Sequence, residues 1–224
     1  KADVSEWYNV KLNYSKNYRV PTFNDLYWYA GGNINLKAET VHQYEITNEF
    51  QYKAFQFQVA GYYNDFQNLL KWSPNESGNW TPENVENVKS YGAEFSLNFK
   101  QNFKAFQIES TTNYSYTKSV DEKTQKQLIY VPYHKFTSNW NFNYHRVSFN
   151  YQMVFNGAVF TSTDNSFFLK EHTVSNISFY YLFGKHKNII LSVSANNVEN
   201  RYYENLPSRP MPGRYYTTSL IFNL

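Results

Sequence analysis

Apolar and polar residues alternate along several long segments of the chain, and this pattern predicts β-strands. The clearest alternation covers residues 93–100, 135–142 and 147–155. Because consecutive side chains of a strand point to opposite faces, each segment has one apolar and one polar face. The polar residues are mainly Asn, Gln, Ser, Thr and Lys, which suit a water-filled lumen. A soluble β-sandwich has the same local pattern, so alternation alone leaves both folds open.

The lengths of the strands and of their connections distinguish these two folds. We expect ten strands, at residues 6–15, 41–53, 54–64, 87–100, 103–118, 131–144, 146–160, 168–183, 188–198 and 214–224. Short and long connections alternate between them, and the long ones are 16–40, 65–86, 119–130, 161–167 and 199–213. Transmembrane barrels have short periplasmic turns and long extracellular loops, an order that Greek-key sandwiches have no reason to keep. The sequence therefore predicts an all-β fold, an antiparallel transmembrane β-barrel whose tilted strands are long enough to cross a bilayer.

The composition agrees with this fold class. Aromatic residues make up 21% of the 224 residues, and transmembrane barrels concentrate such residues in girdles at both membrane interfaces. The mean hydropathy is −0.68, and apolar runs such as residues 189–191 are far too short for a membrane-spanning helix. The net charge of +3 is too small and too dispersed to indicate nucleic-acid binding. No signal peptide opens the chain, so we expect that one was cleaved or that the chain is a fragment.

In such a barrel one face of each strand contacts lipid and the other faces the lumen. The residues assigned to lipid are Phe95, Leu97, Phe136, Trp140, Phe149, Tyr151 and Phe222. The residues assigned to the lumen are Glu94, Lys135, Asn139, Asn150 and Gln152. If the ten strands are part of a larger barrel, the first and the last of them should not pair with each other.

Two boxes in the first long connection carry the most specific signal in the chain. Residues 18–28 read YRVPTFNDLYW, and residues 32–39 read GNINLKAE. This pair of boxes resembles the region shared by TonB-dependent outer-membrane receptors, and it is most similar to the vitamin B12 receptor branch of that family. Ile34 and Ala38 stand where the family usually has proline. The resemblance continues in order through residues 62–65, 84–87, 92–94, 195–198, 201–203 and 210–214. The chain ends in Leu224, where the family usually has Phe.

The resemblance implies a barrel of about 22 strands that is plugged by an N-terminal globular domain. Residues 1–224 would then be the C-terminal part of the barrel domain, without the plug. The receptor would lie in the outer membrane of a Gram-negative bacterium and take up a scarce chelate, such as a corrinoid (cobalamin) or a ferric siderophore. Its partners would be the inner-membrane protein TonB, acting through the plug, the barrel-assembly machinery and outer-membrane lipid.

Aromatic residues of the first two long connections are the candidate ligand contacts, because aromatic side chains bury large areas and stack on planar ligands. These residues are Tyr27, Trp28, Tyr29, Trp72 and Trp80. An alternative places Tyr27 and Trp72 in the outer aromatic girdle. The residues at family motif positions are expected to fix loop and strand geometry more than to touch ligand; they are Arg19, Pro21, Asn24, Asn35, Glu39, Gly213 and Arg214.

A small closed outer-membrane barrel with protease or lipase activity is the main alternative of a different class. Its best catalytic candidate is His172, near Asp164, Ser162 and Ser166, although Ser and Asp are also ordinary loop residues. The histidines lie in separate segments without carboxylate partners at the spacing of metal sites, so we expect no metal ligands and no cofactor. A soluble β-sandwich binding module is a third alternative.

Haem is not expected as a ligand of this part of the receptor. Residues 18–36 contain no histidine, whereas family members that bind haem carry a histidine between the two boxes. Imidazole is the usual protein ligand of haem iron, and a tyrosine phenolate is a less common one. His42, just beyond the second box, is a weak substitute.

Overall fold

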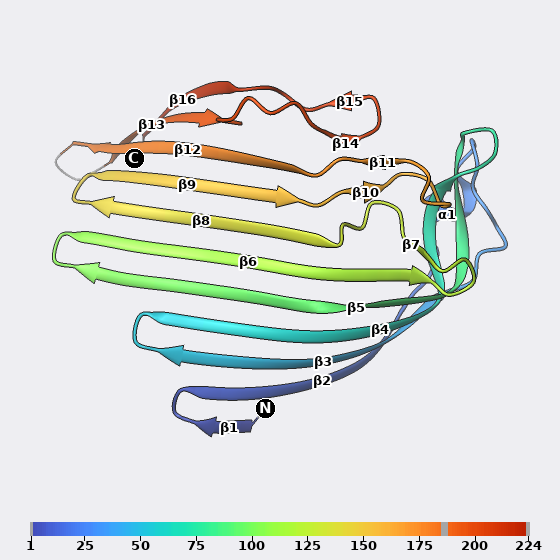
Figure 1. Cartoon of the computed structure of the whole chain (residues 1–224). Coiled ribbons are helices and arrows are strands. Elements are labelled where there is room, and N and C mark those ends of the chain that lie inside the picture. The colour runs from blue at the N-terminus through green and yellow to red at the C-terminus, as the bar shows by residue number, and fades with distance from the viewer. Residues whose placement is uncertain (1, 185–187, 223–224) are drawn as a thin grey trace.

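The computed structural model describes residues 2–184 and 188–222, and of Glu86 the backbone alone. These residues form one antiparallel, twelve-stranded sheet (Figure 1). Its ten long strands are β2 (Tyr8–Arg19), β3 (Glu39–Tyr52), β4 (Phe55–Pro74), β5 (Trp80–Phe103), β6 (Phe106–Asp121), β8 (His134–Tyr144), β9 (Val147–Asn156), β12 (His172–Phe183), β13 (Ile189–Asn196) and β16 (Tyr215–Phe222). The short strands β1 (Ala2–Ser5) and β7 (Lys126–Gln127) pair with β2 and β6.

The connections alternate between short turns at one end of the sheet and long segments at the other, as predicted (Figure 1). The long segments contain the helix α1 (Phe23–Tyr27) and two small hairpins. The first hairpin joins β10 (Val159–Phe160) to β11 (Phe168–Leu169), and the second joins β14 (Glu204–Leu206) to β15 (Arg209–Pro210). Within the described residues, no helix is long and apolar enough to cross a membrane.

The prediction of a long loop at residues 65–86 is wrong. The β4–β5 ladder continues from Leu69 opposite Val85 to Pro74 opposite Trp80, and a turn at residues 75–79 closes it. This stretch lacks the strict alternation of a half-buried strand, although its backbone still pairs. Strands β4 and β5 have 20 and 24 residues, about twice the number needed to cross a bilayer. The hairpin therefore projects well beyond the membrane-crossing band.

The two ends of the sheet do not meet. Strand β1 lies at one end of the strand order and β16 at the other, and no pairing joins them in the described part of the chain. This confirms the expectation that the first and last predicted strands do not pair. A closed ten-stranded barrel, on which the enzyme alternative rested, is not formed. Both edge strands present backbone N–H and C=O groups along their outer sides. In lipid, these groups need further strands as hydrogen-bond partners.

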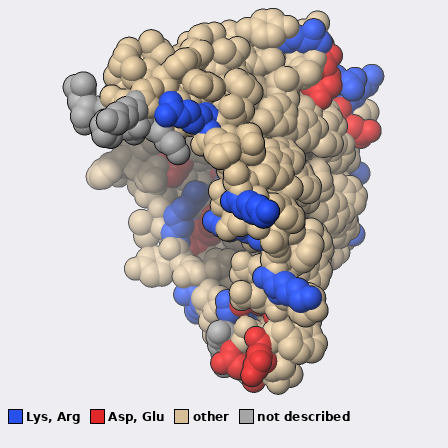
Figure 2. Space-filling view, turned by 90° about the vertical axis from the view of Figure 1, so that its left-hand side faces the viewer, with Lys and Arg blue, Asp and Glu red and all other residues tan. Residues whose placement is uncertain are grey.

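The predicted division of the strands into two faces is confirmed. Trp140 lies opposite Tyr151, and Phe149 opposite Phe179, so the seven residues assigned to lipid share one face. The five polar residues lie on the other face, where the Nδ2 of Asn150 donates to Oδ1 of Asn139 at 2.7 Å. The sheet curves around this polar face, and charged side chains line its hollow side (Figure 2).

Two rows of aromatic side chains border the apolar face. Tyr14, Tyr44, Tyr63 and Tyr91 are register partners on four adjacent strands, toward the long connections. Phenylalanine dominates toward the short turns, where Phe55 pairs with Phe99 and Phe103 with Phe106, and the rest of that row includes Phe50, Phe57, Phe142, Phe149, Phe179 and Phe183. Two such girdles around an apolar band are typical of a transmembrane barrel.

Candidate functional site

The first long connection begins with a short helix that is fixed by its own capping residues. Thr22 is the N-cap of α1, and its hydroxyl accepts from the backbone N–H of Asp25 at 3.2 Å. In return, Oδ2 of Asp25 accepts from the backbone N–H of Thr22 at 2.8 Å. This reciprocal arrangement is a capping box, which satisfies two backbone donors at the helix start. It orients the residues of the first sequence box.

The same carboxylate attaches the helix to the β4–β5 hairpin. The indole Nε1 of Trp72 donates to Oδ1 of Asp25 at 2.8 Å. The backbone N–H of Thr22, followed by its hydroxyl and the Trp72 indole, holds the pKa of Asp25 below its ordinary value of 3.8, against an opposing effect of burial. Asp25 therefore stays charged at neutral pH, and a charged acceptor makes a stronger hydrogen bond than a neutral one.

Arg19 and Glu39 tie the ends of the first connection to β4. The guanidinium of Arg19 donates to the backbone oxygen of Leu70 at 3.1 Å, and its Nε lies 3.8 Å from Oε2 of Glu39. That carboxylate oxygen also accepts from the backbone N–H of Leu70 at 2.8 Å. Two of the predicted motif residues thus contact each other and β4 at the two ends of the first connection.

The second box lies against the tip region of the hairpin. A Cβ at Gly32 would lie 2.5 Å from the backbone nitrogen of Trp28, so a larger residue would displace the chain. Asn84 makes three hydrogen bonds that join the box to β4: its side chain bonds both backbone groups of Lys37 and donates to the oxygen of Asn68. The backbone N–H of Asn35 bonds Oδ1 of Asn33 at 3.0 Å.

These contacts present an aromatic surface at the loop end of the sheet. Tyr29, Tyr27, Trp28 and Trp80 are 90%, 64%, 44% and 43% exposed. They lie on neighbouring segments, because a Cβ at Gly31 would be 3.2 Å from the backbone oxygen of Trp80. We call the four residues and Tyr130 the aromatic surface.

Tyr130 joins this surface from a third segment, the one between β7 and β8. Its ring centroid lies 6.3 Å from that of Trp80, and its backbone N–H bonds the oxygen of Phe160. Burial raises the pKa of its phenol. Sequence reasoning missed Tyr130, because nothing in the local pattern of residues 128–133 relates it to the first two connections.

Trp72 differs from the other predicted contacts. It lies within β4 and is half-buried, and Asp25 occupies its indole N–H. Tyr27 lies on α1, whereas the girdle rows are formed by strand residues such as Tyr44 and Tyr63. The structure thus separates Trp72, which holds the loop, from the exposed aromatic residues.

A second set of motif residues fastens the connection before the last strand. Asn197 is almost fully buried, and its amide donates to the backbone oxygens of Arg201 and Pro212 at 2.8 and 3.1 Å. The backbone N–H of Arg214 bonds Oδ1 of Asn200 at 2.8 Å. A Cβ at Gly213 would lie 2.9 Å from this Asn200 oxygen, which explains a glycine there.

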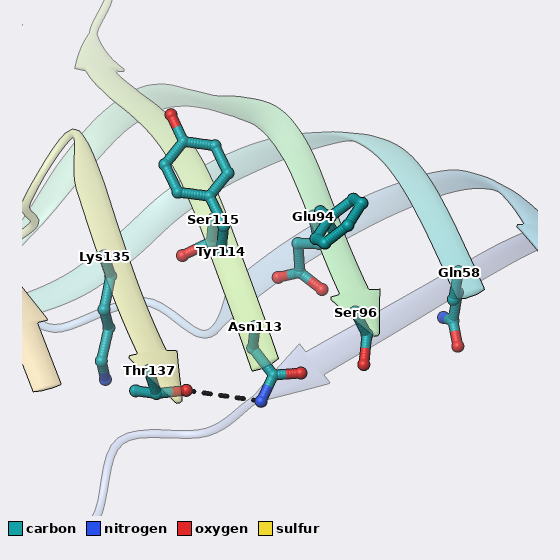
Figure 3. Close-up of a pocket in the computed structure, with 9 residues that line it drawn as sticks. Gln58, Glu94, Ser96, Asn113, Tyr114, Ser115, Lys135 and Thr137 are labelled. Carbon is teal, nitrogen blue, oxygen red and sulfur yellow. Dashed lines mark hydrogen bonds between the residues drawn. The ribbon is translucent and has the colours of Figure 1, made fainter. Parts of the chain in front are cut away.

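The hollow face of the sheet contains a shallow polar pocket of about 310 Å³. Glu94, Asn113, Lys135 and Thr137 point into it from three neighbouring strands, whereas the ring of Tyr114 points to the opposite face (Figure 3). The amide of Asn113 donates to the hydroxyl of Thr137 at 3.3 Å. Such a wall is wet and carries charges of both signs, as the lumen of a barrel does.

The catalytic alternative gains no support from the geometry. The carboxylate of Asp164 accepts from the hydroxyl of Ser162 at 2.6 Å and from the backbone N–H and hydroxyl of Ser166 at 3.1 and 2.8 Å, and these bonds lower its pKa to about 2. His172 is engaged elsewhere: its Nε2 lies 3.3 Å from the amide of Asn156, and its ring stacks on Tyr203. Ser162, Asp164 and Ser166 thus form a hydrogen-bonded loop motif, and His172 packs separately from them. No group of three or more potential metal ligands occurs among the described residues.

Comparison with known proteins identifies the family. Residues 2–198 match the family described as TonB dependent receptor-like, beta-barrel. The chain belongs to this family. Two relatives are named Vitamin B12 transporter BtuB. The protein from Photobacterium profundum is 28% identical over 185 residues, and the protein from Vibrio vulnificus (strain YJ016) is 37% identical over 84 residues.

The receptor barrel is also the fold of the similar solved structures. Copper transporter OprC superimposes with a TM-score of 0.81 at 15% identity over 99% of the chain. The siderophore receptor PirA from Acinetobacter baumannii superimposes with a TM-score of 0.77 at 18% identity over 98% of the chain. The chain covers 38% and 39% of these structures, and 80% of the chain matches 30% of the Photobacterium protein. It therefore corresponds to a minor part of each full-length receptor.

Proposed function

We propose that residues 1–224 form the C-terminal part of the barrel of a TonB-dependent receptor that takes up a scarce chelate across a Gram-negative outer membrane. The open sheet is consistent with a larger closed barrel, of about 22 strands, in which other strands cover both edges. In this role the protein transports and does not catalyse a reaction.

The observation that carries this proposal is the aromatic surface. Three segments that are distant in sequence bring Tyr27, Trp28, Tyr29, Trp80 and Tyr130 to one end of the sheet. Large rigid rings exposed beyond the membrane suit a bulky, planar or polycyclic ligand, because stacking adds to the burial of apolar area. The capping box and the Asp25–Trp72 bond preorganise this surface, which lowers the ordering cost of binding.

The chemical class of ligand follows from what the surface offers. Its exposed groups are aromatic rings, phenols and indoles, and no cluster of potential metal ligands occurs in the described residues. Such a surface suits an already chelated metal, held by its organic shell. Cobalamin and ferric siderophores are chelates of this kind, and the names of the similar receptors mention vitamin B12 and siderophore.

The remaining partners follow from the family. TonB would supply energy through a plug domain, the barrel-assembly machinery would insert the protein, and the apolar face of the sheet would contact outer-membrane lipid. The polar pocket beside Glu94 and Lys135 would form part of the lumen wall past which the ligand moves.

Ligand binding by the full-length receptor tests the proposal. Purified receptor would be titrated with cyanocobalamin and with a ferric siderophore by calorimetry. Replacing Tyr29 or Trp80 by Ala should weaken binding of the cognate chelate by roughly tenfold, because each ring contributes stacking and burial. Tyr202→Ala is the matched control, since Tyr202 is a well-exposed tyrosine on another connection. Unchanged affinity in both variants would refute the assignment of this surface.

A further inference from the structure

Most of the short turns at the opposite end of the sheet share a chemical feature that the uptake role does not use. Four of them are two-residue turns, and three of these carry one permanent cation each: Lys53, Lys104 and Arg146. The turn between β1 and β2 instead contains Glu6 and Trp7. The fifth short connection also contains lysines, at 185 and 187, which lie outside the described residues. Figure 2 views this end of the sheet and shows Lys and Arg side chains spaced along it, with acidic side chains in the hollow, at the lower end and at the upper right.

Two of these cations stand next to the aromatic girdle row near the short turns, and the turn of Arg146 is closed by Tyr144 opposite Val147. Lys53 follows Tyr52 directly, and its Nζ lies 5.0 Å from the centre of that ring. Lys104 follows Phe103 directly, and Phe103 pairs with Phe106 across the turn. Aromatic girdles mark the depth of the membrane interface. A cation one residue beyond the girdle is therefore at the depth of the lipid headgroups.

Two acidic residues near the three cationic turns are occupied by other cations. Glu49 pairs with Lys11 at 2.5 Å, and Glu109 pairs with Lys100 at 2.6 Å, both on the hollow face. Among the described residues, no ion pair involves the three turn cations. They consequently retain their charge for a partner outside the protein.

The spacing of the turns suits a row of separate anions. Successive hairpins are two strands apart, which corresponds to about 10 Å along the sheet edge. A single compact ligand could not reach three cations at this spacing, whereas neighbouring lipid headgroups can each contact one. Lys and Arg close to a membrane surface attract anionic lipids.

We propose that Lys53, Lys104 and Arg146 bind the phosphate groups of anionic phospholipids in the leaflet at the turn end of the barrel. The proposal rests on the outer-membrane location given above but not on the identity of the transported ligand. The turns would thereby fix the depth and tilt of the barrel in the membrane. Each cation would bind one headgroup just beyond the aromatic row.

Lipid selectivity of the full-length receptor tests the proposal. The receptor would be reconstituted in nanodiscs that contain phosphatidylcholine and phosphatidylglycerol, and bound lipids would be counted by native mass spectrometry. The triple variant Lys53→Gln, Lys104→Gln, Arg146→Gln should lower the preference for phosphatidylglycerol by roughly tenfold or more, because each cation near the surface attracts anionic lipid. The control variant Lys123→Gln, Lys170→Gln, Arg209→Gln removes three exposed cations from the long connections and should leave the preference unchanged.

Further measurements separate this effect from misfolding and from ligand uptake. Heat-modifiable electrophoretic mobility reports a folded barrel, and chelate binding should persist in the triple variant. In the wild-type receptor, added NaCl should reduce the preference, because salt screens exposed charges. A wild-type receptor without preference, a preference that survives in the folded triple variant, or a preference insensitive to salt would each overturn the proposal. If the triple variant does not fold, the preference for phosphatidylglycerol is measured in the single Lys53→Gln and Lys104→Gln variants. An undiminished preference in both would overturn the proposal.

Discussion

The indole of Trp72 and the carboxylate of Asp25 are joined by a hydrogen bond of 2.8 Å across 47 residues of sequence. The bond connects the capped helix α1 to the long β4–β5 hairpin, and it holds the two segments that carry most of the aromatic surface. A hydrogen bond to a charged group contributes about 1.5–3 kcal/mol. This contact therefore adds to the order that the contacts of Arg19, Glu39 and Lys37 with the hairpin give to the first connection.

Breaking this bond should release the first connection. Trp72→Phe removes the donor and Asp25→Asn removes the charge, and each should increase the rate at which an added protease cleaves residues 20–38 of the full-length receptor. The double variant should show little further increase over Asp25→Asn alone, because Asp25→Asn weakens the bond to Trp72 as well as the capping contacts with Thr22. A coupling of about 1–3 kcal/mol is expected from the cycle. Fully additive effects would mean that the two residues act independently.

The order of the first connection should depend on pH in the acid range only. The pKa of Asp25 is lowered in the folded protein, chiefly by the backbone N–H of Thr22. A lowered carboxyl pKa contributes stability that is present above the ordinary value of 3.8 and is lost as the pH falls through the lowered value. Chelate affinity should thus be constant from neutral pH to about pH 4 and decrease below it.

Asp25→Asn provides the control for this pH dependence. The variant should bind the chelate more weakly at neutral pH. Its affinity should not decrease further in acid, since residue 25 no longer titrates. A decrease in affinity centred well above about pH 4 in the wild-type receptor, or an unchanged acid step in the variant, would contradict the role of Asp25.

The two faces of β9 should respond oppositely to a new charge. Phe149 lies on the apolar face between Phe142 and Phe179, whereas Asn150 lies on the polar face. Phe149→Lys should destabilise the receptor in lipid vesicles by about 1 kcal/mol, since Phe149 lies in the girdle row near the interface, while Asn150→Lys should cost less. Denaturant unfolding in vesicles measures both, and equal costs would show that the face assignment is wrong.

Haem should not bind to this part of the receptor through a protein–iron bond. His42, the histidine nearest to the boxes, lies on β3, and its Nδ1 is 3.0 Å from the hydroxyl of Tyr14 on the apolar face. The aromatic surface contributes phenols and indoles, of which only a phenolate could ligate haem iron. Titration of the full-length receptor with haemin should give no stoichiometric Soret shift. A shift that is lost in His42→Ala or Tyr27→Ala would refute this expectation.

The division of each strand into two faces was determined by the sequence alone. Side-chain direction has a period of two in a strand, so Phe149 and Asn150 must lie on opposite faces whatever the strand pairs with. The alternation of short and long connections likewise followed from the spacing of these segments. The two boxes at 18–28 and 32–39 identified the family by resemblance, which the match over residues 2–198 confirms.

The tertiary structure decided how far the strands extend and which loop residues meet. The ladder between β4 and β5 continues to Pro74 opposite Trp80 because backbone hydrogen bonds do not require an alternating pattern. Trp72, a ligand candidate by sequence, became the anchor of the first connection once Asp25 was placed beside its indole. Tyr130 joined Trp80 from a third segment. These contacts link residues distant along the chain, and their energies depend on the pairing of whole segments, which local periodicity does not encode.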